Sequence, residues 1–137
     1  MLTSQPTIDA MIGPALRRIT EFADLPPNWD SYGAVPVSAR ALASARTLIE
    51  EVAAAGSMRD NARTAPWTSA PIADAGIQVE WLGDRARIEV QVAPDGTIGF
   101  VIERGEGDDA EYEERDEIAR DAAVSTVVSM ASARLPF

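Results

Sequence analysis

The segment from Ile77 to Ile102 reads IQVEWLGDRARIEVQVAPDGTIGFVI, and in three stretches of it apolar residues occupy every second position. A period of two is typical of half-buried antiparallel strands. Gly83-Asp84 suits a two-residue hairpin loop, and Pro94-Asp95-Gly96 suits a three-residue loop with glycine in the left-handed position. The segment therefore predicts a three-stranded antiparallel meander.

The two loops also predict how the strands are aligned. With Gly83-Asp84 as the first loop and Pro94 to Gly96 as the second, each apolar side chain faces another on one side of the sheet. The predicted pairs are Val79–Ile88, Ile77–Val90, Val92–Ile98, Val90–Phe100 and Ile88–Ile102. A slip of one residue would destroy this agreement, because it would turn every apolar side chain to the other face.

The same alignment decides between two interpretations of the polar side. Glu80 and Glu89 are candidates for paired catalytic carboxylates. In the predicted register, however, Glu80 faces Arg87 and Arg87 faces Glu103, which makes a solvated row of cross-strand ion pairs. We favour this structural interpretation.

Helical spacing appears before and after the meander. Apolar residues recur at that spacing over residues 8–22, and the position of Pro14 favours a helix over residues 14–23. A second helix is predicted after Ser38, a suitable N-cap, and a third over residues 116–133. A short fourth strand over residues 110–114 is left open, because its strand propensity is poor.

These elements define the predicted fold class. It is α+β, with N-terminal helices, a three- or four-stranded antiparallel meander and a C-terminal helix packed on the sheet. No internal repeat divides the chain, so residues 1–137 are predicted to form a single domain. Residues 57–75 form a long connection, and we expect its Trp67 to anchor it to the body of the protein.

Composition excludes several kinds of site. The chain has no cysteine and no histidine, and its 12 basic residues are all arginine. Ser-His and Cys-His nucleophilic sites, Cys-ligated zinc and disulfides therefore cannot be built from it. Carboxylate chemistry and an all-oxygen Mg²⁺ or Ca²⁺ site remain open, but we expect no metal and no cofactor, and an enzyme is the less favoured hypothesis.

Net charge and hydropathy limit the kinds of partner that the protein is expected to bind. The net charge of −10 would repel a phosphate backbone, so we expect no direct nucleic-acid binding. No apolar run reaches the roughly 20 residues that cross a bilayer, and the N-terminus lacks a signal-peptide pattern. We therefore expect a cytoplasmic protein that does not associate with membranes.

The segment LPPNWDSYGA, residues 25–34, places two aromatic residues in a predicted loop. Asp30 can accept hydrogen bonds from nearby backbone donors in an Asx-type turn, and Gly33 permits a left-handed step, which explains the composition structurally. In this interpretation Trp29 and Tyr32 lock the loop onto the body. Alternatively, Trp29, Asp30 and Tyr32 line a shallow binding pocket.

Two motifs carry a resemblance. Asn-Trp-Asp-Ser-Tyr-Gly-Ala over residues 28–34 and Gly-Ile-Gln-Val-Glu-Trp over residues 76–81 resemble a group of small uncharacterised bacterial proteins that share Asn-Trp-Asp-x-Tyr-Gly-Ala and Gly-Ile-x-x-Glu-Trp segments. The similarity extends from about Leu25 to Gly96. It supplies no catalytic residues, but it implies one recurring arrangement of residues. Its members are Trp29, Asp30, Tyr32, Glu80 and Trp81.

A strongly acidic run over residues 106–117 completes the candidate sites. It lacks the spacing of an EF-hand loop, which disfavours a Ca²⁺ site. The favoured interpretation is a solvated loop and helix start, and the alternative is a surface for a basic protein partner. Its candidate residues are Asp108, Asp109, Glu111, Glu113 and Glu114.

The leading hypothesis is a non-enzymatic, acidic protein-binding module of antitoxin, immunity-protein or inhibitor type. The alternative is a small-ligand-binding or Mg-dependent enzymatic domain that uses the Trp29–Tyr32 loop. A third hypothesis is a homo-oligomeric structural subunit.

Overall fold

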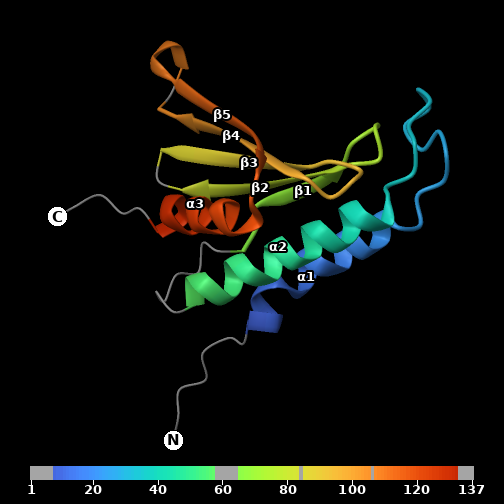
Figure 1. Cartoon of the computed structure of the whole chain (residues 1–137), viewed down its shortest axis with the longest axis horizontal. Coiled ribbons are helices and arrows are strands. Elements are labelled where there is room, and N and C mark those ends of the chain that lie inside the picture. The colour runs from blue at the N-terminus through green and yellow to red at the C-terminus, as the bar shows by residue number, and fades with distance from the viewer. Residues whose placement is uncertain (1–7, 58–64, 84, 106, 133–137) are drawn as a thin grey trace, which may run out of the picture.

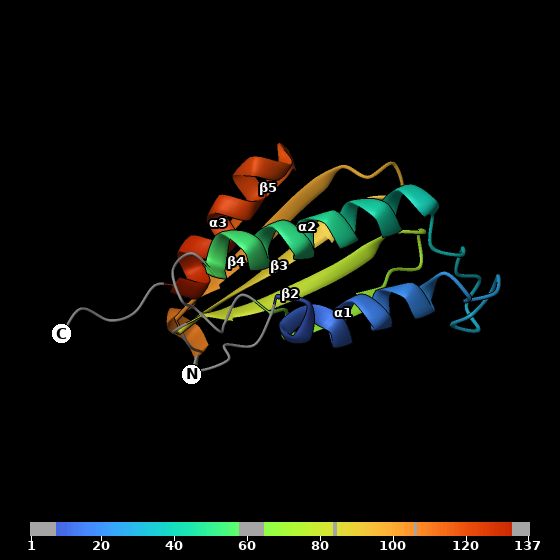
Figure 2. The same cartoon turned by 90° about the horizontal axis from the view of Figure 1, so that it is seen from below.

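The computed structural model describes residues 8–57, 65–83, 85–105 and 107–132. The structure has two layers, and Figures 1 and 2 show all three helices on one side of a single sheet. This arrangement confirms the α+β class, with two helices before the sheet and one after it.

The sheet is a five-stranded antiparallel meander in the order β1-β2-β3-β4-β5. Its strands are β1 (Thr68–Pro71), β2 (Ile77–Gly83), β3 (Ala86–Val92), β4 (Ile98–Arg104) and β5 (Glu111–Ile118). It therefore has more strands than the three or four predicted. β1 lies inside the segment predicted as a long connection, and β5 is longer than the optional fourth strand.

The helices are α1 (Ile8–Phe22), α2 (Ala39–Ser57) and α3 (Arg120–Ser132), and a short 3₁₀ helix, η2 (Gly107–Asp109), precedes β5. The prediction that the first helix begins at Pro14 is wrong, because α1 continues through that proline. Ile12 and Ile19 lie on either side of Pro14 and are both buried. Tertiary burial of this apolar face outweighs the loss of one backbone donor.

Ser38 caps α2 as predicted, since its Oγ accepts a hydrogen bond from the Ala41 amide at 3.0 Å. The hydroxyl also donates to the Pro94 carbonyl at 2.6 Å, which ties the helix start to the β3–β4 loop. The capping interaction is thus both local and tertiary.

The core lies between the helices and one face of the sheet. Alternate strand residues supply most of it, as the period of two predicts. The buried strand residues are Ile77, Val79, Trp81, Ile88, Val90, Val92, Ile98, Phe100 and Ile102. The helices contribute Ile12, Ile19, Leu48, Ile49, Val52, Ala123 and Val127.

The predicted register holds for the second hairpin and is wrong for the first. Val92 faces Ile98 as expected. In the first hairpin, Gly83 stays in β2 and faces Ala86, so the prediction that Gly83 belongs to the loop is wrong. The other predicted loop residue, Asp84, lies outside the described residues. Arg85 takes the left-handed conformation with φ 53°.

A bulge ends the sheet next to α3. Ile98 on β4 faces Ile118 on β5, and the next pair is Phe100 with Arg115. Two residues of β5, Asp116 and Glu117, therefore oppose the single residue Gly99 on β4. A Cβ on Gly99 would lie 2.9 Å from the Arg115 carbonyl oxygen, so the bulge requires glycine there. The third helix therefore starts at Arg120 rather than at Asp116. The predicted end of this helix, residue 133, lies outside the described residues.

Candidate functional site

The face of the sheet turned away from the described helices, called the open face below, carries polar side chains from all five strands. Side chains alternate between the two faces of a pleated sheet, so the residues between the core positions gather here. Cross-strand pairing arranges them in rows. One row holds Thr68, Glu80, Glu89, Val101 and Glu114. The next row holds Leu82, Arg87, Glu103 and Tyr112.

Three carboxylates of the first row, Glu80, Glu89 and Glu114, form what we call the acidic row. Glu80 lies directly opposite Glu89 in the register of β2 and β3. Like charges in directly opposed positions of an antiparallel pair destabilise a sheet. The prediction that Glu80 faces Arg87 is therefore wrong, since Arg87 faces Leu82 instead.

Arg87 nevertheless contacts two carboxylates. It donates from Nε to Glu103 Oε2 at 2.6 Å, the cross-strand pair that the sequence predicted. Its Nη1 lies 3.7 Å from Glu80 Oε1, a diagonal contact. The hydrogen bond to Glu103 is the main reason why the pKa of the Arg87 guanidinium is raised. The two rows hold four carboxylates and this one guanidinium, so the open face is acidic.

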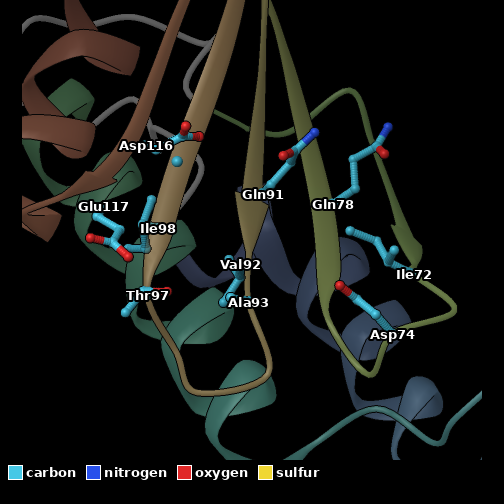
Figure 3. Close-up of a pocket in the computed structure, with 11 residues that line it drawn as sticks. Ile72, Asp74, Gln78, Gln91, Val92, Ala93, Thr97, Ile98, Asp116 and Glu117 are labelled. Atoms are coloured by element: carbon cyan, nitrogen blue, oxygen red, sulfur yellow. The ribbon is translucent and has the colours of Figure 1, made fainter.

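A groove of about 490 Å³ extends the open face toward the bulge. Its floor is formed by the row on the other side of the acidic row from Leu82 and Arg87. In this row Gln78 faces Gln91, and Gln91 faces Gly99. Figure 3 shows the two glutamines side by side, with Asp116 beyond Gln91 and Asp74 below Gln78. Amides and carboxylates together can accept several hydrogen bonds from a cationic or polar group.

The structure divides the predicted acidic partner surface among three places. Asp108 and Asp109 lie on the exposed η2 turn. In β5, Glu111 and Glu113 belong to the face that carries the core, whereas Glu114 lies on the open face. The period of two explains this division, so only Glu114 joins the acidic row.

Glu113 is neutralised locally. Arg104 Nη1 lies 3.2 Å from its Oε1, and Arg115 Nε lies 3.4 Å from its Oε2. The hydrogen bond from Arg104, followed by the charges of both arginines, lowers the pKa of the Glu113 carboxyl. The Glu113 carboxylate therefore belongs to a structural ion-pair cluster with Arg104 and Arg115 and is less suited to contact a partner.

The Trp29–Tyr32 loop is held by its own side chains. Asp30 Oδ1 accepts hydrogen bonds from the amides of Tyr32 at 2.8 Å and Ala34 at 3.0 Å, as the sequence predicted. Trp29 Nε1 donates to the Val35 carbonyl at 3.2 Å. Tyr32 is 92% exposed, so the prediction that its ring locks the loop onto the body is wrong.

Three residues of this loop have left-handed backbone conformations. They are Asn28 at φ 62°, Ser31 at φ 68° and Gly33 at φ 86°. The Asn28 side chain supports this path, because its Oδ1 accepts a hydrogen bond from the Gly33 amide at 2.6 Å. The loop therefore presents the Tyr32 ring to solvent from a well-supported backbone.

Trp81 does not belong to this loop or to any exposed site. It is 1% exposed and lies in the core, whereas Glu80, its neighbour, points to the open face. β2 begins at Ile77 near the loop, since Val35 forms a bridge with Asp74. Trp81 is four residues further on, about 13 Å along the strand. The structure thus separates Trp81 from Trp29, Asp30 and Tyr32, which the sequence had grouped with it.

Trp67 is also not where the sequence predicted it. It is 68% exposed, so it does not anchor its segment to the core. Its ring lines a pocket of about 410 Å³ together with Leu82, which is itself 38% exposed. The sequence does not predict this pocket, because nothing in the spacing of Trp67 and Leu82 shows that the pairing of β1 with β2 brings them together.

Within the described residues, no three acidic side chains are grouped so that they could hold a metal ion, and no helix is long and apolar enough to cross a membrane. Comparisons of the chain with protein-family models, curated proteins and solved structures found no match. The candidate site is therefore defined by the geometry of the open face alone.

Proposed function

We propose that the chain is a non-enzymatic, acidic module that binds a protein with a basic surface through the open face, as an antitoxin, immunity protein or inhibitor does. The observation that carries this proposal is the direct opposition of Glu80 and Glu89 on a sheet face from which the described helices are absent. Glu114 continues the same row on β5, across Val101.

The charge arrangement supports a cationic partner. Two opposed carboxylates repel each other in the free protein, and a guanidinium or ammonium group placed over them would relieve this repulsion. Arg87 relieves this repulsion only in part. Its short contact is with Glu103, and its distance to the Glu80 carboxylate is 3.7 Å. An acidic face also accelerates the encounter with a basic protein and discriminates against acidic ones.

The alternative of a ligand-binding or Mg-dependent enzymatic domain at the Trp29–Tyr32 loop has weaker support. Asp30 would be its polar group, but Asp30 Oδ1 already accepts two backbone hydrogen bonds. This favours a structural role for the carboxylate. We therefore keep the loop as architecture in the proposal.

Affinity capture from the cells that produce the protein tests the proposal. The bait is compared with a double variant, Glu89→Gln with Glu114→Gln, which removes two charges from the open face. Glu80 is left unchanged, because its side chain is only 14% exposed and contacts Arg87. The matched control, Glu21→Gln with Asp24→Asn, removes two charges from exposed positions at the end of α1 and just after it.

The proposal predicts a partner with a basic surface that is captured by the wild type and by the control at low and at physiological salt. The open-face variant should capture much less of it at low salt, and the difference from the wild type should be smaller at physiological salt, where screening weakens the attraction between charges. Equal capture by all three baits, or no partner at either salt concentration, would contradict the proposal.

A further inference from the structure

The pocket beside Trp67 is an apolar feature at the rim of an acidic face. It is lined by Ala65, Pro66, Trp67, Leu82 and Gly83. A large indole that is 68% exposed, next to a leucine that is 38% exposed, leaves apolar surface in water that the fold itself does not bury. Exposed tryptophans in pockets are typical anchor points of protein interfaces.

The pocket is continuous with the acidic row. The Trp67 amide donates a hydrogen bond to the Glu80 carbonyl at 2.7 Å. Leu82 is two positions along β2 from Glu80, so both side chains project from the open face about 7 Å apart. Leu82 also faces Arg87 across the strands, and Arg87 is drawn toward Glu103.

From this continuity we propose that the Trp67–Leu82 pocket receives an apolar side chain of the same basic partner, with a basic residue two positions away from it in an extended segment. The inference rests on the proposed function. The spacing supports it, because residues i and i+2 of an extended segment are about 7 Å apart, which matches the separation of Leu82 and Glu80. Glu89 lies about 5 Å from Glu80 across the strands, on β3, where the long side chain of a further basic residue can reach it.

The charges select this occupant over two simpler ones. A purely apolar partner would cover Glu80 and Glu89 without pairing them, and unpaired charges are expensive to remove from water. A purely basic partner would leave the indole of Trp67 exposed. A segment with both kinds of side chain covers the Trp67 indole and also pairs the carboxylates of Glu80 and Glu89.

Three synthetic pentapeptides with blocked ends serve as probes. Their sequences are Leu-Ser-Arg-Ser-Arg, Ala-Ser-Arg-Ser-Arg and Leu-Ser-Gln-Ser-Gln. Binding to the full chain is followed by the indole N–H resonances of its three tryptophans, Trp29, Trp67 and Trp81. Trp67→Phe assigns the Trp67 signal, and the indoles of half-exposed Trp29 and buried Trp81 act as internal references.

The inference predicts that the first peptide shifts the Trp67 indole signal and binds about tenfold more tightly than the alanine peptide, which corresponds to about 1.4 kcal/mol. The glutamine peptide should bind more weakly than the first. Trp67→Ala should abolish the preference for leucine over alanine while both arginine peptides still bind. This exposed position tolerates the change, and circular dichroism confirms the fold.

The other outcomes are distinct. Equal binding of the leucine and alanine peptides, with an unmoved Trp67 signal and a loss of binding in the Glu89→Gln, Glu114→Gln variant, would overturn the pocket and leave the proposed function standing. Equal binding of the glutamine and arginine peptides would show that the pocket acts apart from the acidic row, which also overturns the inference. Failure of both arginine peptides to bind at millimolar concentration would contradict the inference and weaken the proposed function.

Discussion

Replacing Asp30 by alanine is expected to lower the free energy of unfolding by about 2 kcal/mol, whereas replacing Tyr32 by alanine is expected to leave it nearly unchanged. The two residues stand in one loop, and the sequence offers both as contacts for a ligand. The structure assigns them different roles. Asp30 Oδ1 accepts two backbone hydrogen bonds at 2.8 and 3.0 Å, and the Tyr32 ring is 92% exposed.

The magnitude follows from these bonds. A net contribution of about 1 kcal/mol for each bond to a half-exposed carboxylate gives about 2 kcal/mol for the pair. Asp30→Asn keeps an acceptor oxygen in the same place, so it should cost about 0.5–1 kcal/mol. Tyr32→Ala removes a ring that is almost fully in water and should change stability by less than about 0.5 kcal/mol.

Urea denaturation followed by circular dichroism measures these differences. With a slope of about 2 kcal/mol per molar urea, Asp30→Ala should lower the midpoint by about 1 M and Tyr32→Ala by less than about 0.3 M. A neutral Asp30→Ala variant, or a Tyr32→Ala variant that is destabilised as much as Asp30→Ala, would contradict these two roles.

Three further perturbations test the fold. Gly99→Ala should lower stability by about 1–3 kcal/mol in thermal denaturation, because its Cβ would lie 2.9 Å from the Arg115 carbonyl oxygen; an unchanged melting temperature would contradict the bulge geometry. Trp81→Ala should lower it by about 3–5 kcal/mol in urea denaturation and Trp67→Ala by less than about 0.5 kcal/mol, since the first indole is buried and the second is not; similar losses would contradict their placement. The pKa of Glu113 is depressed below its ordinary value of 4.5, so its ion pairs stabilise the protein above that pH and are lost as pH falls through the lowered pKa. The melting-temperature difference between wild type and Glu113→Gln should therefore shrink between pH 7 and pH 3, and a constant difference would refute the ion-pair role.

The sequence was sufficient to predict which side chains of the three central strands point to the core and which point away from it. Alternation determines which side chains point to the core, and the three predicted strands do so as expected. It could not determine the first hairpin. A shift of two residues keeps every side chain on its face, so Trp81 facing Ile88 satisfies the apolar pattern as well as Val79 facing Ile88 does. The choice depended on the loop, where Arg85, a residue outside the predicted Gly83-Asp84 loop, adopts the left-handed conformation.

The edge strands were predicted incompletely for a different reason: the sequence indicates a connection where β1 lies, and only an optional short strand over residues 110–114 where β5 lies. β5 reads EYEERDEI and has no apolar alternation, because most of its residues are exposed. Its place in the sheet comes from pairing with β4, which local sequence does not encode. For the candidate site, the sequence identified acidic character but not its distribution, because Glu111 and Glu113 turn away from Glu114 only once they form a strand. The exposure of Trp67 likewise depends on tertiary contacts that spacing does not reveal.

The most direct test of the open face as an interface uses the captured partner in purified form. Its association rate and dissociation constant are measured with the wild type, the Glu89→Gln, Glu114→Gln variant and the Glu21→Gln, Asp24→Asn control, at low and at physiological salt. We expect about tenfold weaker binding and a slower association rate for the open-face variant at low salt, with a smaller difference at physiological salt and little effect of the control. Equal affinities for the open-face variant and the control would contradict it, because the net charge of the chain would then matter and the open face would not.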